Sequence, residues 1–270
     1  MSFESPLCGK QNLVCLSYMV LDGKWALVTG AAKGIGRGIA VELAHAGCNV
    51  IVNDYGDSPG AHDTAEMVRH AGTAAEVRLA DVSSGEAVNQ LFKGITTLDI
   101  LVNNAGVQTW KPLLEVEEPE WDRVIDTNLK GCFLCTQRAA KLMRDSGRGG
   151  RIINIGSGCN RIGFPRLIAY TASKGGIETF TKVSAAELGK YGITVNCVAP
   201  GAIETERTRL EAGDYAATWA AATPMGRVGN PQDVGRAVVF LASPRADFIS
   251  GQTLGVDGGL FAKPHWPYEW

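Results

Sequence analysis

A tyrosine and a lysine four residues apart are the side chains of this sequence best suited to proton transfer. Tyr170 and Lys174 lie in the segment A-Y-T-A-S-K, residues 169–174. On a helix this spacing places both side chains on one face, one turn apart. A phenol ordinarily ionises at a pH of about 10, and a neighbouring ammonium group lowers that pKa because it favours the phenolate. We therefore expect Tyr170 to exchange a proton with an alcohol or a carbonyl oxygen, and Lys174 to lower its pKa.

Two further polar residues could complete this proton-transfer site. Ser157 follows Arg151–Ile155, an apolar segment that predicts a strand, so its hydroxyl would be free to hold a substrate oxygen at the end of that strand. Asn128 falls within a long predicted helix from Pro119 to about Arg144, where asparagine is unfavourable unless its amide has a partner. For Asn128 alone, a tolerated polar residue on the surface is an equally good interpretation.

A glycine-rich turn joins the first predicted strand, Trp25–Thr29, to the first predicted helix, Gly34–Ala46. Glycine permits a tight turn and lets backbone N–H groups approach a pyrophosphate, which then faces the positive end of the helix dipole. A purely structural turn is the alternative. The residues expected to bind a dinucleotide in this turn are Gly30, Lys33, Gly34, Ile35 and Gly36.

Two charged residues give opposite indications about the dinucleotide. Asp54 closes the second predicted strand, Asn49–Asn53, where a carboxylate can accept hydrogen bonds from the adenosine ribose and repel a 2′-phosphate. Lys33 could instead attract that phosphate. We predict NAD, because the carboxylate would lie directly against the ribose hydroxyls and is followed by Tyr55 rather than by arginine. NADP remains possible.

The remaining apolar segments alternate between strand and helix. The predicted strands Ala75–Ala80, Asp99–Val102, Thr194–Val198 and Thr253–Val256 alternate with the predicted helices Ala61–Ala71, Gly85–Phe92 and Pro231–Ala242. Seven buried strands separated by helices predict an α/β fold with one domain, a doubly wound Rossmann sheet that is mostly parallel and covered on both faces. At its carboxyl edge we expect further cofactor-binding residues: Asp81, Val82, Asn104, Ala105 and Gly106.

The composition of the chain argues against three kinds of partner: nucleic acid, membrane and metal. The chain of 270 residues has a net charge of −2, so no basic surface points to nucleic acid. The apolar run Leu13–Leu21 is too short to span a bilayer, and no membrane partner is expected. The seven cysteines have no metal-ligand spacing, so no metal site is expected, and a cytoplasmic location fits. Cys132 and Cys135 form a C-x-x-C inside a predicted helix, which favours buried structural thiols over a redox pair.

These features together resemble the short-chain dehydrogenase/reductase family over essentially all of residues 24–259. The matching motifs are T-G-x-x-x-G-x-G at 29–36, N-N-A-G at 103–106, Asn128, Ser157, Y-x-x-x-K at 170–174, P-G at 200–201 and G-Q-T-L-G-V-D-G-G at 251–259. The resemblance implies an NAD(P)-dependent oxidoreductase that transfers a hydride between nicotinamide and a CH–OH or C=O group. A non-catalytic, dinucleotide-sensing scaffold protein on the same fold is the alternative from another class.

The same resemblance implies a role for each matching residue. Tyr170 would be the general acid/base, Lys174 would also bind the nicotinamide ribose, and Ser157 would fix the reacting oxygen. Asn128 would hold a water in a proton relay toward Lys174. Besides Tyr170 and Lys174, the family pattern adds three residues to the cofactor site: Pro200, Gly201 and Ile203.

The substrate is less clearly indicated. Within the family, the sequence is similar to glucose 1-dehydrogenases, so an aldose or a secondary alcohol is the first expectation, and a 3-oxoacyl-[acyl-carrier-protein] reductase is the alternative. The candidate pocket residues suit either a polar or an apolar small molecule. They are Gln108, Trp110, Cys159, Asn160, Arg161 and Phe164. Residues 206–223 are expected to form a mobile lid over this pocket.

Both ends of the chain differ from the domain between them. Residues 1–22 are expected to be an N-terminal extension, residues 23–262 the Rossmann domain, and residues 263–270 a C-terminal tail. The tail is strongly aromatic, and aromatic side chains favour burial at interfaces. Because the family is usually tetrameric, we expect a homotetramer with this tail packed on a neighbouring subunit.

Overall fold

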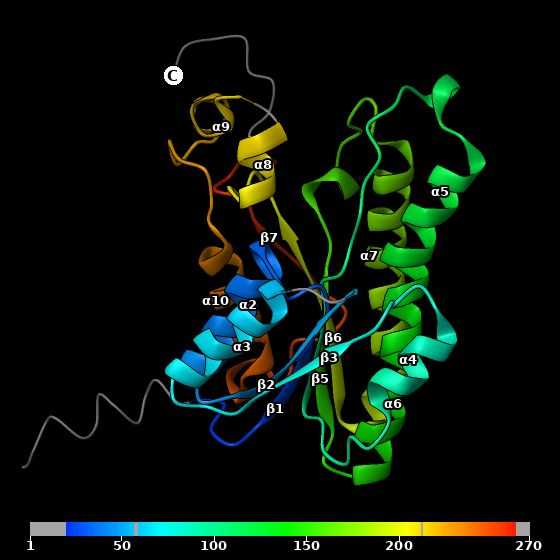
Figure 1. Ribbon diagram of the computed structural model, residues 1–270, viewed down its shortest axis with the longest axis vertical. Coiled ribbons are helices and arrows are strands. Elements are labelled where there is room, and N and C mark those ends of the chain that lie inside the picture. Colours follow the sequence, from blue (N-terminus) through cyan, green and yellow to red (C-terminus); the bar gives the residue numbers. More distant parts are fainter. Residues whose placement is uncertain (1–19, 57–58, 212, 263–270) are drawn as a thin grey trace, which may run out of the picture.

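A parallel sheet of seven strands, in the order β3-β2-β1-β4-β5-β6-β7, forms the centre of the molecule (Figure 1). The structure is a computed structural model that describes residues 20–56, 59–211 and 213–262. Every predicted strand is present, with ends within two residues of the prediction. The strands are β1 (Trp25–Val28), β2 (Asn49–Asp54), β3 (Ala75–Leu79), β4 (Ile100–Asn103), β5 (Gly150–Ile155), β6 (Ile193–Pro200) and β7 (Thr253–Val256).

Helices cover both faces of this sheet, as the doubly wound prediction requires (Figure 1). On one face lie α2 (Gly34–His45), α3 (Pro59–His70) and α10 (Pro231–Ala242). On the other lie α4 (Gly85–Phe92), α5 (Glu118–Ile125), α6 (Gly131–Ser146) and α7 (Ile168–Leu188). Short 3-10 turns occupy Leu113–Glu115, Gly158–Asn160, Gly189–Tyr191 and Pro244–Ala246.

Alternation of side chains along each strand supplies the two layers of the core. In β5, Ile152 packs in the core beneath α6, whereas its neighbour Ile153 packs in the core beneath α2 and α10. Both are fully buried, as are most residues of β1 and β2. Removing such a side chain from water stabilises the fold by roughly 1.5–3 kcal/mol. Successive side chains of a strand therefore point to opposite faces of the sheet and are buried on both.

The long helix predicted from Pro119 to about Arg144 is interrupted. Its chain path continues from α5 into α6, but residues Asp126–Lys130 form a π-helical turn between them. Such a turn contains one more residue than an α-helical turn, which rotates its side chains relative to the regular helix. Asn128 lies in this segment, and the re-aimed amide is directed toward the interior.

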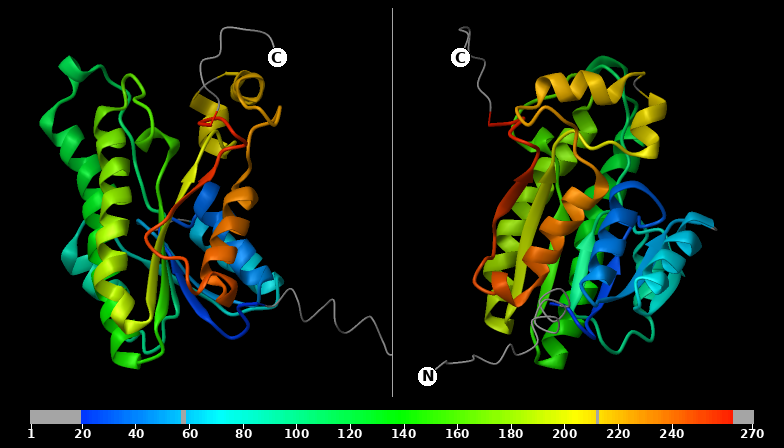
Figure 2. Two further views of the ribbon diagram at one scale, coloured as in Figure 1. Left: turned by 180° about the vertical axis from the view of Figure 1, so that it is seen from behind. Right: turned by 90° about the vertical axis from the view of Figure 1, so that its left-hand side faces the viewer.

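The expected lid consists of two short helices, α8 (Glu206–Glu211) and α9 (Tyr215–Ala222). Figure 2 shows from two further directions that they stand beyond the carboxyl ends of the strands. Most of the expected N-terminal extension, and the whole aromatic tail with its predicted subunit contact, lie outside the described residues. Leu21, at the end of that extension, is 2% exposed and packs in the core, so the folded domain includes it.

Among the residues that the structure describes, no helix is both long enough and apolar enough to cross a membrane.

Candidate active site

A cavity of about 1250 Å³ opens at the carboxyl edge of the sheet, between the strand ends and the lid helices. It brings together nearly all of the predicted site residues, although they come from distant parts of the sequence. From the predicted cofactor set it is lined by Gly30, Lys33, Gly34, Ile35, Gly36, Asp54, Asp81, Val82, Asn104, Ala105, Gly106, Pro200, Gly201 and Ile203. From the predicted catalytic and substrate sets it is lined by Ser157, Tyr170, Lys174, Gln108, Trp110, Cys159 and Phe164.

The Tyr170–Lys174 pair lies at the cavity wall as its helical spacing predicted. Both residues are in α7, and the Lys174 ammonium nitrogen is 5.5 Å from the centre of the Tyr170 ring. Lys174 is buried and donates a hydrogen bond of 2.7 Å to the backbone oxygen of Ile155, at the end of β5. The 3-10 turn that follows β5 begins after Ser157, which interacts with the Tyr170 side chain by hydrogen bonding. Strand β5 and helix α7 thus position the three groups together.

The electrostatics of Tyr170 differ from the sequence-based expectation. Burial raises the pKa of Tyr170 to about 12, and the hydrogen bond with Ser157 opposes this only in part. Lys174 is not among the groups that lower this pKa. Burial also lowers the pKa of Lys174 to about 8, which weakens its charge in the alkaline range. In the protein without cofactor, loss of hydration therefore dominates the pKa of Tyr170, and the lowering of that pKa by Lys174 stays a prediction.

Asn128 is not the surface residue that one interpretation of the sequence allowed. It is 2% exposed, and its amide oxygen accepts a hydrogen bond of 2.8 Å from the backbone N–H of Val107. Its amide nitrogen donates to the Val107 oxygen and to the Ser173 hydroxyl, each at 3.0 Å. The residue does not line the cavity but ties the loop after β4 to helix α7. It therefore holds two walls of the site in register, and its role in a proton relay stays a prediction.

The glycine-rich loop has a shape that tolerates no side chain at two of its glycines. A Cβ atom on Gly36 would lie 2.2 Å from the Gly30 oxygen, and one on Gly30 would lie 2.8 Å from the Ala105 Cα atom. Gly30 also has a φ of 62°, in the left-handed region that glycine favours. The Asn104 amide donates to the Thr29 and Gly30 oxygens, each at 2.9 Å, so the loop after β4 fixes the loop after β1.

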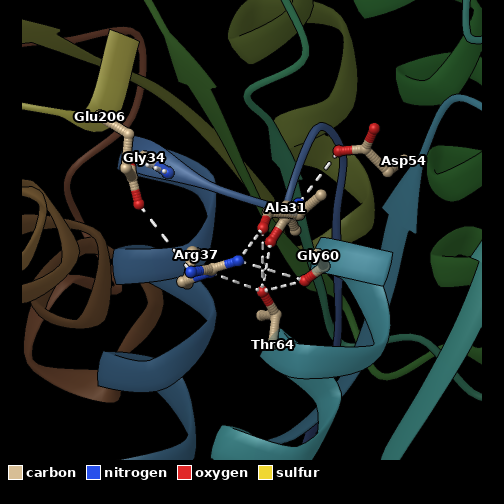
Figure 3. Close-up of polar contacts among 8 residues, drawn as sticks. Ala31, Gly34, Arg37, Asp54, Gly60, Thr64 and Glu206 are labelled. Atoms are coloured by element: carbon tan, nitrogen blue, oxygen red, sulfur yellow. Dashed lines mark hydrogen bonds and ion pairs between the residues drawn. The ribbon is translucent and has the colours of Figure 1, made fainter. Parts of the chain in front are cut away.

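Asp54 stands at the end of β2 as predicted. Its carboxylate accepts a hydrogen bond of 3.0 Å from the backbone N–H of Ala32 (Figure 3). It accepts another, of 2.8 Å, from the backbone N–H of Tyr55. These bonds hold the carboxylate over the cofactor loop, where an adenosine ribose could also reach it. The N–H groups of the loop, the start of α2 and this carboxylate form a donor and acceptor set that suits a dinucleotide.

The sequence did not predict two residues whose side chains hydrogen-bond to the glycine-rich loop. Arg37 of α2 donates to Thr64 of α3 at 3.1 Å and also bonds the backbone oxygens of Ala32 and Gly60 (Figure 3). The Thr64 hydroxyl donates to the Ala31 oxygen at 2.9 Å. Nothing in their spacing signals this contact, since α2 and α3 become neighbours only when the sheet has formed.

The substrate end of the cavity is more aromatic than the sequence suggested. Phe164 lies 6.5 Å from Trp219 of α9 and 6.0 Å from Phe261, ring centre to ring centre. Arg161 does not line the cavity, contrary to prediction. The Asn160 amide is held instead by Glu178 of α7, away from the cavity. The lid and the segment after β7 supply the missing lining residues, which are Arg207, Tyr215, Trp219, Leu260 and Phe261.

The C-x-x-C pair is buried, as the structural interpretation predicted. Cys132 and Cys135 are at most 4% exposed, and neither forms a disulfide. Burial raises the pKa of the Cys135 thiol to about 12 and that of Cys132 further. Thiols that stay protonated at neutral pH are poor nucleophiles, so a redox role for this pair is disfavoured.

Comparison with known proteins agrees with this geometry. A family model described as enoyl-(acyl carrier protein) reductase matches residues 30–261. The 3-oxoacyl-[acyl-carrier-protein] reductase FabG of Staphylococcus epidermidis is 41% identical over 242 residues, which cover 88% of this chain and 99% of that protein. An Agrobacterium tumefaciens protein solved with bound NADP is 39% identical, with a TM-score of 0.85, and the match covers 91% of this chain and 99% of that one. Acetoin dehydrogenase from Enterobacter cloacae is 36% identical, with a TM-score of 0.82 and a match that covers 91% and 98% of the two chains.

Proposed function

Because this chain belongs to the short-chain dehydrogenase/reductase family and is an oxidoreductase that uses NAD(P), we propose that it reduces the ketone of a 3-oxoacyl group to a secondary alcohol. The observation that carries the proposal is that Tyr170, Ser157 and Lys174 meet at the wall of one cavity. Tyr170 is protonated at neutral pH, as is any tyrosine whose pKa is about 10 or higher, so it has a proton to give to a carbonyl oxygen. Reduction of a carbonyl needs an acid at its oxygen, whereas alcohol oxidation needs a base.

The residues around Tyr170 account for the rest of the step. When bound, NAD(P)H supplies the hydride that reduces the carbonyl carbon. Ser157 positions the carbonyl oxygen by a hydrogen bond, and Tyr170 donates its proton to that oxygen as the alcohol forms. Lys174 holds the end of β5 through Ile155, and its ammonium can bond the ribose next to the nicotinamide. The proton balance is complete with one proton from Tyr170, which bulk solvent restores after product leaves.

The cofactor would lie along the carboxyl edge from Asp54 to Pro200. Gly30 and Gly36 let the loop pack tightly against itself and against the loop after β4, and Asp54 favours a free ribose 2′-hydroxyl. We retain NAD as the expected cofactor on this ground. The relative with bound NADP keeps NADP as the alternative.

Reduction of a 3-oxoacyl group is supported better than oxidation of an aldose, our first expectation. Two lines favour it: the relatives at 41% identity are named 3-oxoacyl-[acyl-carrier-protein] reductases, and Phe164, Trp219 and Phe261 give the cavity an apolar wall. The matched family model is named for alkene reduction instead.

Following NADH and NADPH absorbance with a short 3-oxoacyl thioester, a sugar series and simple ketones tests this assignment. We expect the thioester to exceed glucose by at least roughly a hundredfold in kcat/KM. Tyr170→Phe should lose roughly 10²–10⁴-fold in turnover, the usual contribution of general acid catalysis, with dinucleotide affinity within about twofold of the parent. A higher kcat/KM for glucose than for every 3-oxoacyl compound would reject the substrate, and near-normal turnover of Tyr170→Phe would reject the mechanism.

A further inference from the structure

The first residue of the lid reaches the start of the cofactor-binding helix. Glu206 begins α8, and its carboxylate accepts a hydrogen bond of 3.2 Å from the backbone N–H of Gly34, the first residue of α2. Its second oxygen lies 3.9 Å from the Arg37 guanidinium (Figure 3). Glu206 lines the same cavity as the glycine-rich loop. A carboxylate therefore stands where the loop presents its N–H groups to an anion.

Helix α2 has no acidic group of its own at this end. Lys33 is the N-cap residue and makes no side-chain cap bond, and the first turn contains no aspartate or glutamate. The first N–H groups of a helix need acceptors, and the positive end of its dipole favours an anion. Glu206 supplies both from a segment 172 residues further along the chain.

We propose that Glu206 occupies the pyrophosphate site in the free protein and must leave it when the dinucleotide binds. The inference rests on NAD(P) use by this chain and is independent of the carbonyl substrate. Since Glu206 belongs to α8, its departure moves the start of the lid at the moment the cofactor enters. Glu206 thus lowers dinucleotide affinity and couples the lid to the cofactor.

The surroundings of Glu206 suit a contact that is made and broken. Its side chain is 55% exposed, and its ion pair with Arg37 is long. Arg37 itself is held by Ala32, Gly60 and Thr64, so it keeps its place under the loop when the carboxylate leaves. A single exposed contact at a helix start is modest in strength, so the competition should weaken binding by roughly two- to fivefold.

The test compares charge-matched variants in their affinity for ADP and for adenosine. Glu206→Gln removes the charge but keeps an acceptor for Gly34, and Glu206→Ala removes both. Glu204→Gln is the matched control, because Glu204 is two residues from Glu206, pairs with Arg209 and does not line the cavity. Titration calorimetry at low and at high salt gives the dissociation constants without turnover.

We expect both Glu206 variants to bind ADP about two- to fivefold more tightly than the parent at low salt, with a smaller gain at high salt because screening weakens exposed charges. Adenosine, which has no pyrophosphate, should bind all four proteins equally, and Glu204→Gln should match the parent. Equal or weaker ADP binding by both Glu206 variants would overturn the proposal. An equal gain in Glu204→Gln, or an equal gain for adenosine, would also overturn it, because the effect would then be one of general charge.

Discussion

Lys174 provides the sharpest quantitative prediction of this structure. Its side chain is 4% exposed, and burial lowers its pKa from 10.5 to about 8. In the unfolded chain the same lysine titrates at its ordinary value. Between these two pKa values the unfolded state binds the extra proton, so the free energy of unfolding must rise with pH across that window. The cost of keeping Lys174 charged is fully present below about pH 8 and disappears as the pH approaches 10.5.

The magnitude follows from the two pKa values. At pH 7 the lowered pKa of Lys174 costs the folded state about 3 kcal/mol, and at pH 10 about 1 kcal/mol. Lys174→Met removes the titration but leaves the Ile155 oxygen without its donor, a loss of about 1–3 kcal/mol that does not depend on pH. The stability of the parent relative to Lys174→Met should therefore increase by about 2 kcal/mol between pH 7 and pH 10.

Urea denaturation at fixed protein concentration, at pH 7, 8, 9 and 10, measures this difference. Subtracting the variant from the parent cancels the other titrating groups. Lys182→Met is the matched control, because Lys182 lies on the same helix with its side chain 58% exposed. Its difference from the parent should stay constant with pH.

A constant difference between the parent and Lys174→Met over this range would refute the reasoning. So would a difference that falls with pH, which would mean that the folded state raises the pKa of Lys174. Either result would place the ammonium in a hydrated or strongly paired environment, in contradiction to its burial beside β5.

Three further predictions concern the cofactor loop and the helix junction. Gly36→Ala should lower the free energy of unfolding by about 1–3 kcal/mol in thermal or urea unfolding, because the new methyl group meets the Gly30 oxygen. The control is Gly175→Ala, which should be neutral or stabilising because no atom lies within 4 Å of the added methyl group. Asp54→Asn should raise the ratio of kcat/KM for NADPH over NADH by roughly tenfold, since about 1.4 kcal/mol of repulsion suffices for that change; an unchanged ratio would remove Asp54 from cofactor selection. Asn128→Ala should lower the free energy of unfolding in urea by about 1–3 kcal/mol, because it leaves the buried polar groups of Val107 unpaired. A decrease smaller than the error of the measurement would show that water replaces the amide.

The placement of the proposed catalytic residues was predictable because its signals are local. Tyr170 and Lys174 share a helix, and the turn at Gly30–Gly36 lies directly between a strand and a helix. The parallel, doubly wound sheet needed only the buried, β-branched segments and the rule that parallel strands connect through helices. In each case neighbouring residues carry the information.

The errors arose where the answer depends on packing between distant segments. Arg161 shares the loop of Cys159 and Phe164, yet it does not line the cavity. The Phe164 cluster is completed by Trp219 and Phe261, which no spacing connects to it. The aldose expectation came from motifs of the shared scaffold, which say little about these lining residues.

By itself, the sequence determined the doubly wound sheet, the glycine-rich turn and the pairing of Tyr170 with Lys174 on one helix, because period, glycine placement and helical spacing are properties of short segments. Only the tertiary structure decided the pKa values of Tyr170 and Lys174 and which residues stand over the cofactor loop. Burial raises the pKa of Tyr170 and lowers that of Lys174. The fold also brings Glu206 to the start of α2. The physical reason is that hydration and long-range contact are set by everything packed around a side chain, most of which lies far from it in the sequence.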